Sequence, residues 1–375
     1  MKYYIIAGEA SGDLHASYLM KAIKKRDPEA DFRCWGGDLM AAQGGEIVKH
    51  YKELAFMGFV EVVSHLQTIL NNLKICEIDI LLYEPDAIIL VDYPGFNLRI
   101  AKFAHEQGLK VFYYISPQVW AWKKNRVFKI KKYVDKMLVI LPFEKDFYAR
   151  YDYEVEYVGH PLPEEIEDKI ASNAEKTDTF RQRHQLNDKP IVALLPGSRK
   201  QEIHKMLPEM LSVVKHFPDY QFVVSAVPNQ KLELYQKILG KQNLPIVIDE
   251  TYPLLLNARA ALVTSGTATL ETALLGIPEV VCYKGNPISY AIARLLIKNI
   301  RFISLVNLIM DKEIVKELIQ GELNTQNLKQ QLSALLQDGE QRQKMLQDYK
   351  ELKENLGNAH ASDNAAAIIA GTTAE

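Results

Sequence analysis

The chain has 375 residues, 48% of them hydrophobic, and its 45 Lys and Arg against 47 Asp and Glu give a net charge of −2. This composition excludes general disorder, and the length indicates two or three domains. The balanced charge gives no reason to expect a nucleic-acid partner.

Short apolar runs alternate with helix-period segments almost from end to end. The first five expected strands are Tyr3–Ala7, Ala87–Val91, Lys110–Ile115, Lys136–Ile140 and Glu154–Val158. The next five are Ile191–Leu195, Gln221–Ser225, Pro245–Ile248, Ala260–Val263 and Glu279–Cys282. Helical segments such as Asp13–Lys25 and Leu98–Gln107 separate most of them. The alternation predicts an α/β protein with parallel sheets covered on both faces.

The stretch Leu162–Lys189 lacks a strand and is typical of a connector with one helix. We place the boundary there, with a first domain of residues 1–165 and a second of residues 166–344. After Cys282 the pattern becomes wholly helical, through Ile314–Ile319, Leu328–Leu336 and Met345–Leu356. We expect the tail, residues 345–375, to pack on the first domain or on a partner subunit, which leaves a homodimer open. Two such halves suit a two-lobed enzyme with its ligand in the cleft, near strand carboxyl ends.

The first strand runs into Gly8-Glu9-Ala10-Ser11-Gly12-Asp13, which precedes a helix. Two glycines allow a sharp turn, Ser11 or Asp13 can cap the helix, and free N–H groups at its start suit an anion. The spacing fits neither the dinucleotide-binding pattern GxGxxG nor the P-loop pattern. A tight turn without a ligand is the alternative.

The strand Ala87–Val91 is followed by Asp92, at the position where parallel sheets place catalytic groups. Asp92 could act as a general base toward a bound hydroxyl, or could simply form the turn with Pro94 and Gly95. The following strand leads into Ser116-Pro117-Gln118-Val119-Trp120-Ala121-Trp122. These tryptophans either line a ligand or pack in the core.

A basic stretch, residues 123–136, comes next in the chain and holds a phosphate, contacts an anionic membrane, or is a solvated helix face. An apolar stretch, residues 54–73, is either a core helix or an apolar lip that meets lipid. No stretch approaches the ~18 consecutive apolar residues of a transmembrane helix, and the first residues become polar too quickly for a secretory signal. Three widely spaced cysteines fit a reducing compartment. We therefore expect a cytoplasmic protein with at most peripheral membrane contact.

Two turns in the second half favour a phosphate. Arg199 follows the strand Ile191–Leu195 and could bond a diphosphate through two N–H groups. Ser265, Gly266 and Thr267 offer donors at a helix start, and Glu271 lies one turn further, where it could accept from ribose hydroxyls. A hydroxyl-rich helix cap with a surface glutamate is the alternative.

Metal-binding patterns are absent from the sequence. It contains neither HExxH nor an Asp-x-Asp pair, and its nine histidines form no ligand-spaced cluster. We therefore expect no metal and no cofactor. The charge of a diphosphate would then be balanced by Arg199 and by helix dipoles.

Taken together, these motifs resemble the lipid-A-disaccharide synthase family. The matching segments run in family order from residue 7 to beyond residue 300, and the most specific are EASGD and SPQVWAW. The segments that carry the resemblance are Ala7–Asp13, Met57–Val62, Asp92–Asn97, Tyr114–Trp122, Leu141–Glu144, Gly159–Pro161, Leu195–Arg199, Ser265–Glu271 and Ser304–Leu308.

The resemblance implies an inverting GT-B glycosyltransferase, with two Rossmann-like lobes that face a cleft and no required metal. The donor would bind the C-terminal lobe and the acceptor the N-terminal lobe. The implied reaction transfers 2,3-diacylglucosamine from UDP-2,3-diacylglucosamine to 2,3-diacylglucosamine 1-phosphate (lipid X), forming a β-1,6-linked disaccharide 1-phosphate and UDP. Both substrates carry acyl chains, so peripheral association with the anionic inner-membrane surface is also implied.

The resemblance also implies roles for individual residues. Asp92 becomes the candidate base for the acceptor 6-hydroxyl. The implied UDP-binding residues are Arg199, Ser265, Gly266, Thr267, Glu271 at the ribose and Asn307 near the diphosphate. The implied acceptor-side residues are Glu9, Ser11, Gly12, Asp13, Gln118 and Trp120. The implied acyl or membrane contacts are Phe56, Met57, Phe59, Val60, Leu66 and Ile69.

Three alternatives share parts of this pattern. The GT-B transferase that adds N-acetylglucosamine to the lipid-linked peptidoglycan precursor should have a GxxGGH-type first loop, which residues 8–13 do not match. A UDP-N-acetylglucosamine 2-epimerase would need no apolar patch at residues 54–73. A non-catalytic UDP-sugar or lipid-binding module is disfavoured by the presence of both Asp92 and Arg199.

Overall fold

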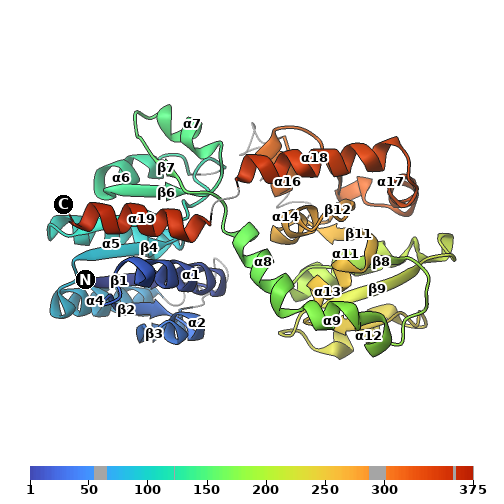
Figure 1. Cartoon of the computed structure of the whole chain (residues 1–375), viewed down its shortest axis with the longest axis horizontal. Helices are drawn as coiled ribbons and strands as arrows, with labels where there is room; N and C mark the ends of the chain where they lie inside the picture. Colours follow the sequence, from blue (N-terminus) through green and yellow to red (C-terminus); the bar gives the residue numbers. More distant parts are fainter. Residues whose placement is uncertain (55–65, 122, 287–300, 358–359, 375) are drawn as a thin grey trace. The chain divides into compact units, whose positions relative to one another are not determined.

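The computed structural model describes residues 1–54, 66–121, 123–286, 301–357 and 360–374. It divides into two compact units (Figure 1). Unit 1 is Met1–Pro161 together with Gly357–Glu375, and unit 2 is Leu162–Leu356. Each unit contains a parallel sheet with helices, so the predicted α/β class is confirmed.

The sheet of unit 1 has the strand order β3-β2-β1-β4-β5-β6-β7, and neighbouring strands pair in parallel. Its strands are β1 (Lys2–Ala7), β2 (Asp31–Gly36), β3 (Glu46–His50), β4 (Ala87–Val91), β5 (Lys110–Tyr114), β6 (Lys136–Val139) and β7 (Glu156–Tyr157). Its helices are α1 (Ala10–Arg26), α2 (Asp38–Ala42), the 3-10 turn η1 (Tyr51–Glu53), α4 (Leu66–Tyr83), α5 (Pro94–Glu106), α6 (Arg126–Tyr133), α7 (Glu144–Ala149) and α19 (Ala361–Ala374). Strand alternation sends Tyr4 and Ile6 to one core and Tyr3 and Ile5 to the other, so both faces of the sheet are covered.

The sheet of unit 2 has the order β10-β9-β8-β11-β12-β13, again parallel throughout. Its strands are β8 (Ile191–Leu195), β9 (Gln221–Ala226), β10 (Ile246–Ile248), β11 (Ala258–Thr264), β12 (Glu279–Tyr283) and β13 (Lys316–Ile319). Its helices are α8 (Leu162–Ser172), α9 (Ala174–Asp178), α10 (Phe180–Arg183), α11 (Lys200–Leu211), η2 (Val214–His216), α12 (Leu232–Leu239), α13 (Thr251–Leu256), α14 (Thr267–Leu274), α16 (Leu305–Met310), η3 (Gln320–Glu322), α17 (Thr325–Leu336) and α18 (Glu340–Leu356). Loops at the carboxyl edge of this sheet therefore lie side by side.

The last helix returns to the beginning of the chain. Figure 1 shows α19, in red, beside the blue α1. Ala365 and Ala366 are fully buried there, and small side chains allow two helices to approach closely. Lys25 Nζ lies 3.0 Å from Asp363 Oδ1, and Asn364 donates to the Val158 carbonyl at 3.0 Å.

Three strands and the connector differ from the sequence predictions. Strands β2 and β3 were not expected, and Ile314–Ile319, expected to be helical, contains strand β13. The spacing of Ile314, Val315, Leu318 and Ile319 is that of one helix face, which explains the wrong prediction. Pairing of Val280 with Lys316 instead adds the segment to the sheet edge as a strand. The connector holds three short helices, α8 to α10, in place of one.

The C-terminal tail also divides at a different residue from the expected 345. Helix α18 belongs to unit 2, and the chain returns to unit 1 at Gly357. The reason is a stripe of Met345, Tyr349, Leu352 and Leu356, which is buried in the core of unit 2. The boundary between the units lies at Pro161 and Leu162. In the described part of the chain, no helix is long and apolar enough to cross a membrane.

Candidate functional site

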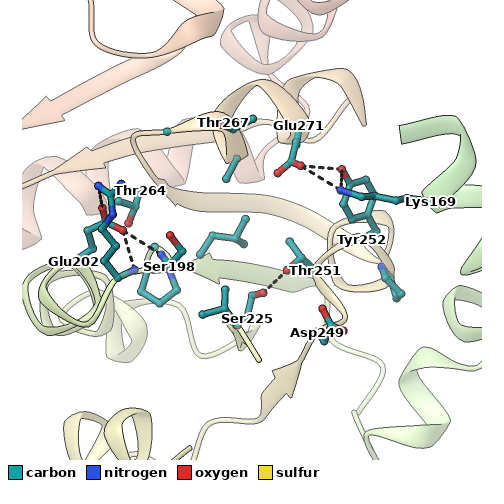
Figure 2. Close-up of a pocket in the computed structure, with 18 of the residues that line it drawn as sticks. Lys169, Ser198, Glu202, Ser225, Asp249, Thr251, Tyr252, Thr264, Thr267 and Glu271 are labelled. Atoms are coloured by element: carbon teal, nitrogen blue, oxygen red, sulfur yellow. Dashed lines mark hydrogen bonds and ion pairs between the residues drawn. The ribbon is translucent and has the colours of Figure 1, made fainter. Parts of the chain in front are cut away.

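A cavity of about 830 Å³ lies at the carboxyl edge of the sheet in unit 2, a size that suits a nucleotide-sized ligand (Figure 2). The turns after β8 and β11 and the start of α13 contribute to its wall, together with α8 and α9 of the connector. Its lining includes Arg199, Ser265, Gly266, Thr267 and Glu271. Five of the six predicted UDP-binding residues therefore surround one cavity.

The turn between β8 and α11 presents a guanidinium group. Gly197 has φ +101°, and a Cβ there would lie 2.6 Å from Glu202 Oε2, so this position requires glycine. The Glu202 carboxylate accepts the backbone N–H groups of Ser198 and Arg199 at 3.1 Å each. The side chain of Arg199 is 74% exposed, with Nη1 3.6 Å from Glu202 Oε1. The group that this turn leaves available for an anion is therefore the Arg199 side chain, because Glu202 already occupies two of the backbone donors.

The turn between β11 and α14 presents backbone donors. The two donors of Ser265 are already bonded within the protein. Its N–H donates to the Cys282 carbonyl at 3.1 Å, and its hydroxyl donates to the Ile303 carbonyl at 3.2 Å. The N–H groups of Gly266 and Thr267 have no acceptor among the described residues, as is usual in the first turn of a helix. These N–H groups and the α14 dipole favour an anion at this edge of the cavity.

Glu271, the predicted ribose ligand, points into the cavity from α14 and is already bonded. Figure 2 shows it facing Tyr252 and Lys169: the Tyr252 hydroxyl donates to Oε1 at 2.9 Å, and Lys169 Nζ lies 3.8 Å from the same oxygen. The Lys169 ammonium also lies 4.8 Å from the centre of the Tyr252 ring. Three elements, α8, α13 and α14, thus fix one carboxylate, which leaves Oε2 for a ligand hydroxyl.

Several lining residues were not predicted from the sequence. Lys169, Ser172, Asn173 and Lys176 come from the connector, while Ser225 lies near the end of β9 and Asp249, Thr251 and Tyr252 follow β10. The Ser225 and Thr251 hydroxyls lie 2.7 Å apart (Figure 2). The rule that ligands bind at strand carboxyl ends, applied to both predicted strands, could have found the second group. Nothing local in the sequence marks the connector residues.

Asn307 does not line the cavity, and its place near the diphosphate stays a prediction. Its side chain is fully buried, and Nδ2 donates to the Val315 carbonyl and to Glu317 Oε1, both at 2.9 Å. Oδ1 accepts the N–H groups of Ile314 at 2.7 Å and Val315 at 3.0 Å. These four bonds occupy the full donor capacity and both acceptor positions of the amide.

In unit 1, Asp92 lies at the carboxyl end of β4, where the sequence predicts a base. Its backbone carbonyl accepts Asn97 Nδ2 at 2.9 Å and the Tyr113 hydroxyl, which holds the turn in place. Burial raises the pKa of Asp92 to about 6, and the negative charge of Glu9 acts in the same direction. A carboxylate with such a pKa is ionised near neutral pH and can still accept a proton.

Asp92 and two residues near it adopt backbone conformations that are unusual for residues other than glycine. Asp92 has φ +44°, Tyr93 φ +45° and Ile115 φ +67°, at the ends of the neighbouring strands β4 and β5. For the β-branched Ile115 this conformation is strained. A Cβ at Gly8 would lie 2.4 Å from the Tyr93 ring, so the β1 turn needs glycine for the ring to approach. Strain that clusters at strand ends indicates a functional site.

The predicted acceptor-side residues of the first turn divide into two groups. Glu9 and Ser11 are exposed at the start of α1, whereas Gly12 and Asp13 are buried. The Asp13 carboxylate accepts the backbone N–H groups of Gly37 at 2.8 Å and of Leu39 and Met40 at 3.2 Å each. Asp13 therefore anchors the start of α2, and three of its acceptor positions are occupied by the protein itself.

The other acceptor-side residues lie in the loop after β5. Gln118 is exposed, and Trp120 is half-buried with its ring edge against Phe143, 5.1 Å between centres. Glu144 lies beneath this loop and accepts the N–H of Leu141 at 3.0 Å, and burial raises its pKa to about 7. The loop is thus supported by a buried carboxyl group, Glu144, to which the sequence analysis assigned no role.

The predicted apolar segment is only partly described. Phe56, Met57, Phe59 and Val60 lie outside the described residues, and Leu66 begins α4. Ile69 is half-buried and packs against the core of unit 1. Further along α4, Ile75, Ile78 and Leu82 are exposed at a spacing that places them on one helix face.

Comparison with known proteins gives a match along nearly the whole chain. The family model described as lipid-A-disaccharide synthetase matches residues 3–370. The lipid-A-disaccharide synthase of Myxococcus xanthus (strain DK1622) is 39% identical over 372 residues, which cover 97% of this chain and 96% of that protein.

Two solved structures share the fold at low sequence identity. The UDP-GlcNAc 2-epimerase of Methanocaldococcus jannaschii, in complex with UDP-GlcNAc and UDP, is 15% identical with a TM-score of 0.66, covering 99% of this chain and 100% of that one. The calicheamicin glycosyltransferase CalG4 is 15% identical with a TM-score of 0.60, covering 98% and 97%. These likenesses show a GT-B fold of two Rossmann-like units.

Proposed function

The chain belongs to the lipid-A-disaccharide synthase family and is a glycosyltransferase, and we propose that its substrates are UDP-2,3-diacylglucosamine and lipid X. The family match along residues 3–370 favours this reaction over the other GT-B transferase, the epimerase and the non-catalytic module. The observation that carries the site assignment is the cavity that brings Arg199, the Gly266 and Thr267 N–H groups and Glu271 together.

The donor binds in this cavity through its UDP group. Arg199 and the start of α14 face the diphosphate, where fixed donors stabilise the charge that builds up on the leaving group. Glu271 accepts from the ribose hydroxyls through the carboxylate oxygen that Tyr252 leaves free. Lys169 and Lys176 add positive charge to the same wall.

Asp92 is the general base of the transfer. It takes the proton of the acceptor 6-hydroxyl as that oxygen forms a bond to the anomeric carbon, while the bond from this carbon to the diphosphate oxygen breaks and UDP leaves. Attack opposite the leaving group inverts the anomeric configuration and gives the β-1,6 linkage. The raised pKa of Asp92, about 6, supports this role because it lies near the working pH.

The reaction needs neither a metal ion nor a cofactor in this proposal. Cationic side chains and helix-start N–H groups at one cavity supply the charge that a metal ion would otherwise supply. The test is a mass-spectrometric assay with both lipid substrates, with and without EDTA. Disaccharide 1-phosphate and UDP formed equally in both samples are the expected result, whereas loss of product with EDTA contradicts the metal-free part.

Both substrates are lipids, so we infer peripheral association of a cytoplasmic protein with the inner membrane. The exposed apolar residues Ile75, Ile78 and Leu82 of α4 and Phe128 in the basic stretch support this inference. Flotation with vesicles that contain anionic lipid should carry the protein upward, and neutral vesicles should carry less. Equal flotation with both would contradict the electrostatic part of the inference.

A further inference from the structure

A buried carboxylate on β13, Glu317, does not line the donor cavity. Its Oε2 accepts the Ile303 N–H at 2.9 Å. Its Oε1 accepts the Ser304 N–H at 2.9 Å, the Ser304 hydroxyl at 2.7 Å and Asn307 Nδ2 at 2.9 Å. A single side chain therefore fixes the backbone of residues 303–304 and the start of α16 by four hydrogen bonds.

The segment that Glu317 holds is itself bonded to the turn between β11 and α14, called here the donor turn. The Ile303 carbonyl, which shares its peptide group with the Ser304 N–H that Glu317 binds, accepts the Ser265 hydroxyl at 3.2 Å. The Ser265 N–H in turn donates to the Cys282 carbonyl at 3.1 Å. The turn before α14 is thus held at two points, by β12 and by the segment that Glu317 anchors.

We propose that Glu317 is a positioning residue for the donor: it fixes Ile303, which holds the Ser265 hydroxyl and so orients the N–H groups of Gly266 and Thr267. The inference rests on the proposed UDP site, because those N–H groups face the diphosphate in it. It also gives Asn307 a role, since the Asn307 amide bonds Glu317 and ties the same segment to Ile314 and Val315.

Positioning has a measurable consequence that differs from stability. A displacement of donors by about 1 Å can change a rate or affinity by about 10²-fold, whereas a merely structural bond changes the unfolding midpoint alone. In Glu317→Gln an amide NH₂ replaces one acceptor oxygen and faces backbone N–H groups. We expect the Kd for UDP to rise about tenfold, with the KM of the donor raised and the KM of lipid X unchanged.

The matched control is Asp348→Asn, which makes the same acid-to-amide change at another buried carboxylate of unit 2. Asp348 pairs with Lys312 at 3.0 Å and does not line the donor cavity. This variant should lower the unfolding midpoint and leave the Kd for UDP unchanged. If Glu317→Gln behaves in the same way, the inference is wrong.

A double-mutant cycle with Ser265→Ala tests the route from Glu317 to the donor turn. Both single changes break one chain of bonds, so the second should add less than about twofold to the Kd of the first. Full additivity would overturn this route. Should Glu317→Gln not fold, Ser304→Ala removes one of the four bonds to Glu317 together with the 3.4 Å cap bond from the Asn307 N–H. An unchanged Kd in that variant overturns the inference.

Isothermal titration of the native chain with UDP separates this inference from the proposed function. No binding by the native chain would contradict the proposed donor site and the inference with it. Binding by the native chain with an equal Kd for Glu317→Gln would overturn the inference alone.

Discussion

Both sheets are parallel, and the polar groups at their carboxyl edges differ: those in unit 1 are bonded within the protein, whereas several in unit 2 remain available to a ligand. In unit 1 the turn after β4 is tightly bonded: Asp92 and Tyr93 have positive φ angles, and Asn97 and Tyr113 bind the Asp92 carbonyl. In unit 2 the turns after β8 and β11 border a cavity of about 830 Å³, with an exposed guanidinium and helix-start N–H groups without acceptors among the described residues.

In the proposed function, this difference corresponds to two chemical tasks. A proton acceptor needs a raised pKa, which burial provides, and a fixed position, which the strained turn provides. A diphosphate site needs several donors that remain available in the empty protein. Changes at the β4 edge should therefore affect turnover more than UDP binding, and changes at the β8 and β11 edges should affect UDP binding strongly.

The largest expected effect is at the base. Asp92→Asn should lower kcat by about 10²- to 10⁴-fold, because the amide cannot take the hydroxyl proton, while the Kd for UDP stays the same. The matched control is Asp86→Asn, at the opposite end of the same strand. Rapid-quench assays and UDP titration check both, and a variant that turns over normally would remove Asp92 as the base.

A large effect on binding is expected at the guanidinium. Arg199→Lys should raise the Kd for UDP and lower kcat/KM by about 10²-fold, since the ammonium cannot bond two phosphate oxygens in a planar fork. Arg181→Lys is the control, because Arg181 binds the carbonyls of Asn187 and Lys189 outside the cavity. Equal Kd values for UDP in the two variants would contradict a specific role of the β8 edge in UDP binding.

The pH dependence of the transfer follows from the raised pKa of Asp92. As the pH falls below about 6 the base becomes protonated, so kcat/KM for lipid X should drop by about tenfold per unit, and above that value it should be flat. Glu9→Gln removes a negative charge that raises this pKa, so its acidic limb should move to lower pH. If the acidic side of the kcat/KM profile moved to higher pH or stayed in place in Glu9→Gln, its assignment to Asp92 would be contradicted.

A moderate effect on stability is expected at Asp13. Asp13→Asn should lower the free energy of unfolding by about 1–3 kcal/mol, because an amide cannot accept all three N–H groups of residues 37–40. The Kd for UDP should not change. Asp38→Asn is the exposed control and should cost little. Denaturant unfolding measures both, and equal stability would return Asp13 to the candidates for acceptor binding.

The smallest expected effect is at Lys169. Lys169→Gln should raise the Kd for UDP by about two- to fivefold, and the difference should shrink at high salt because the side chain is partly exposed. Lys241→Gln, exposed and outside the cavity, makes the same charge change and should leave the Kd unaltered. A larger increase of the Kd for Lys241→Gln would indicate that UDP binding depends on the net charge of unit 2 and not on the position of Lys169.

Much of the fold could be predicted because buried parallel strands carry their pattern locally. Each of the ten expected strands overlaps an observed one, and β4 and β8 have the predicted ends. Strand β2 was missed because the charged Arg33 interrupts its apolar run. The Arg33 guanidinium bonds the Asp79 carboxylate of α4 at 2.7 Å, a partner that no local pattern reveals.

The site was predictable where it follows strand ends and not where it depends on distant partners. Asp92, Arg199 and the Ser265 turn are at the expected ends of strands. The bond from Asn307 to Glu317 could not be predicted, because Glu317 lies in a strand that the sequence suggested to be helical. Lys169 was missed because only the path of the connector brings it to the cavity.

The packing of α19 on α1 has a consequence for the folding of the protein during its synthesis. Unit 1 is not complete until its final helix has left the ribosome, and at about 5–20 residues per second the synthesis of unit 2 in between takes roughly 10–40 s. During this time the faces that bury Ala365, Ala366 and Ile369 stay uncovered on the nascent chain. A premature stop near Gly357 would therefore damage the first-made unit and spare the second.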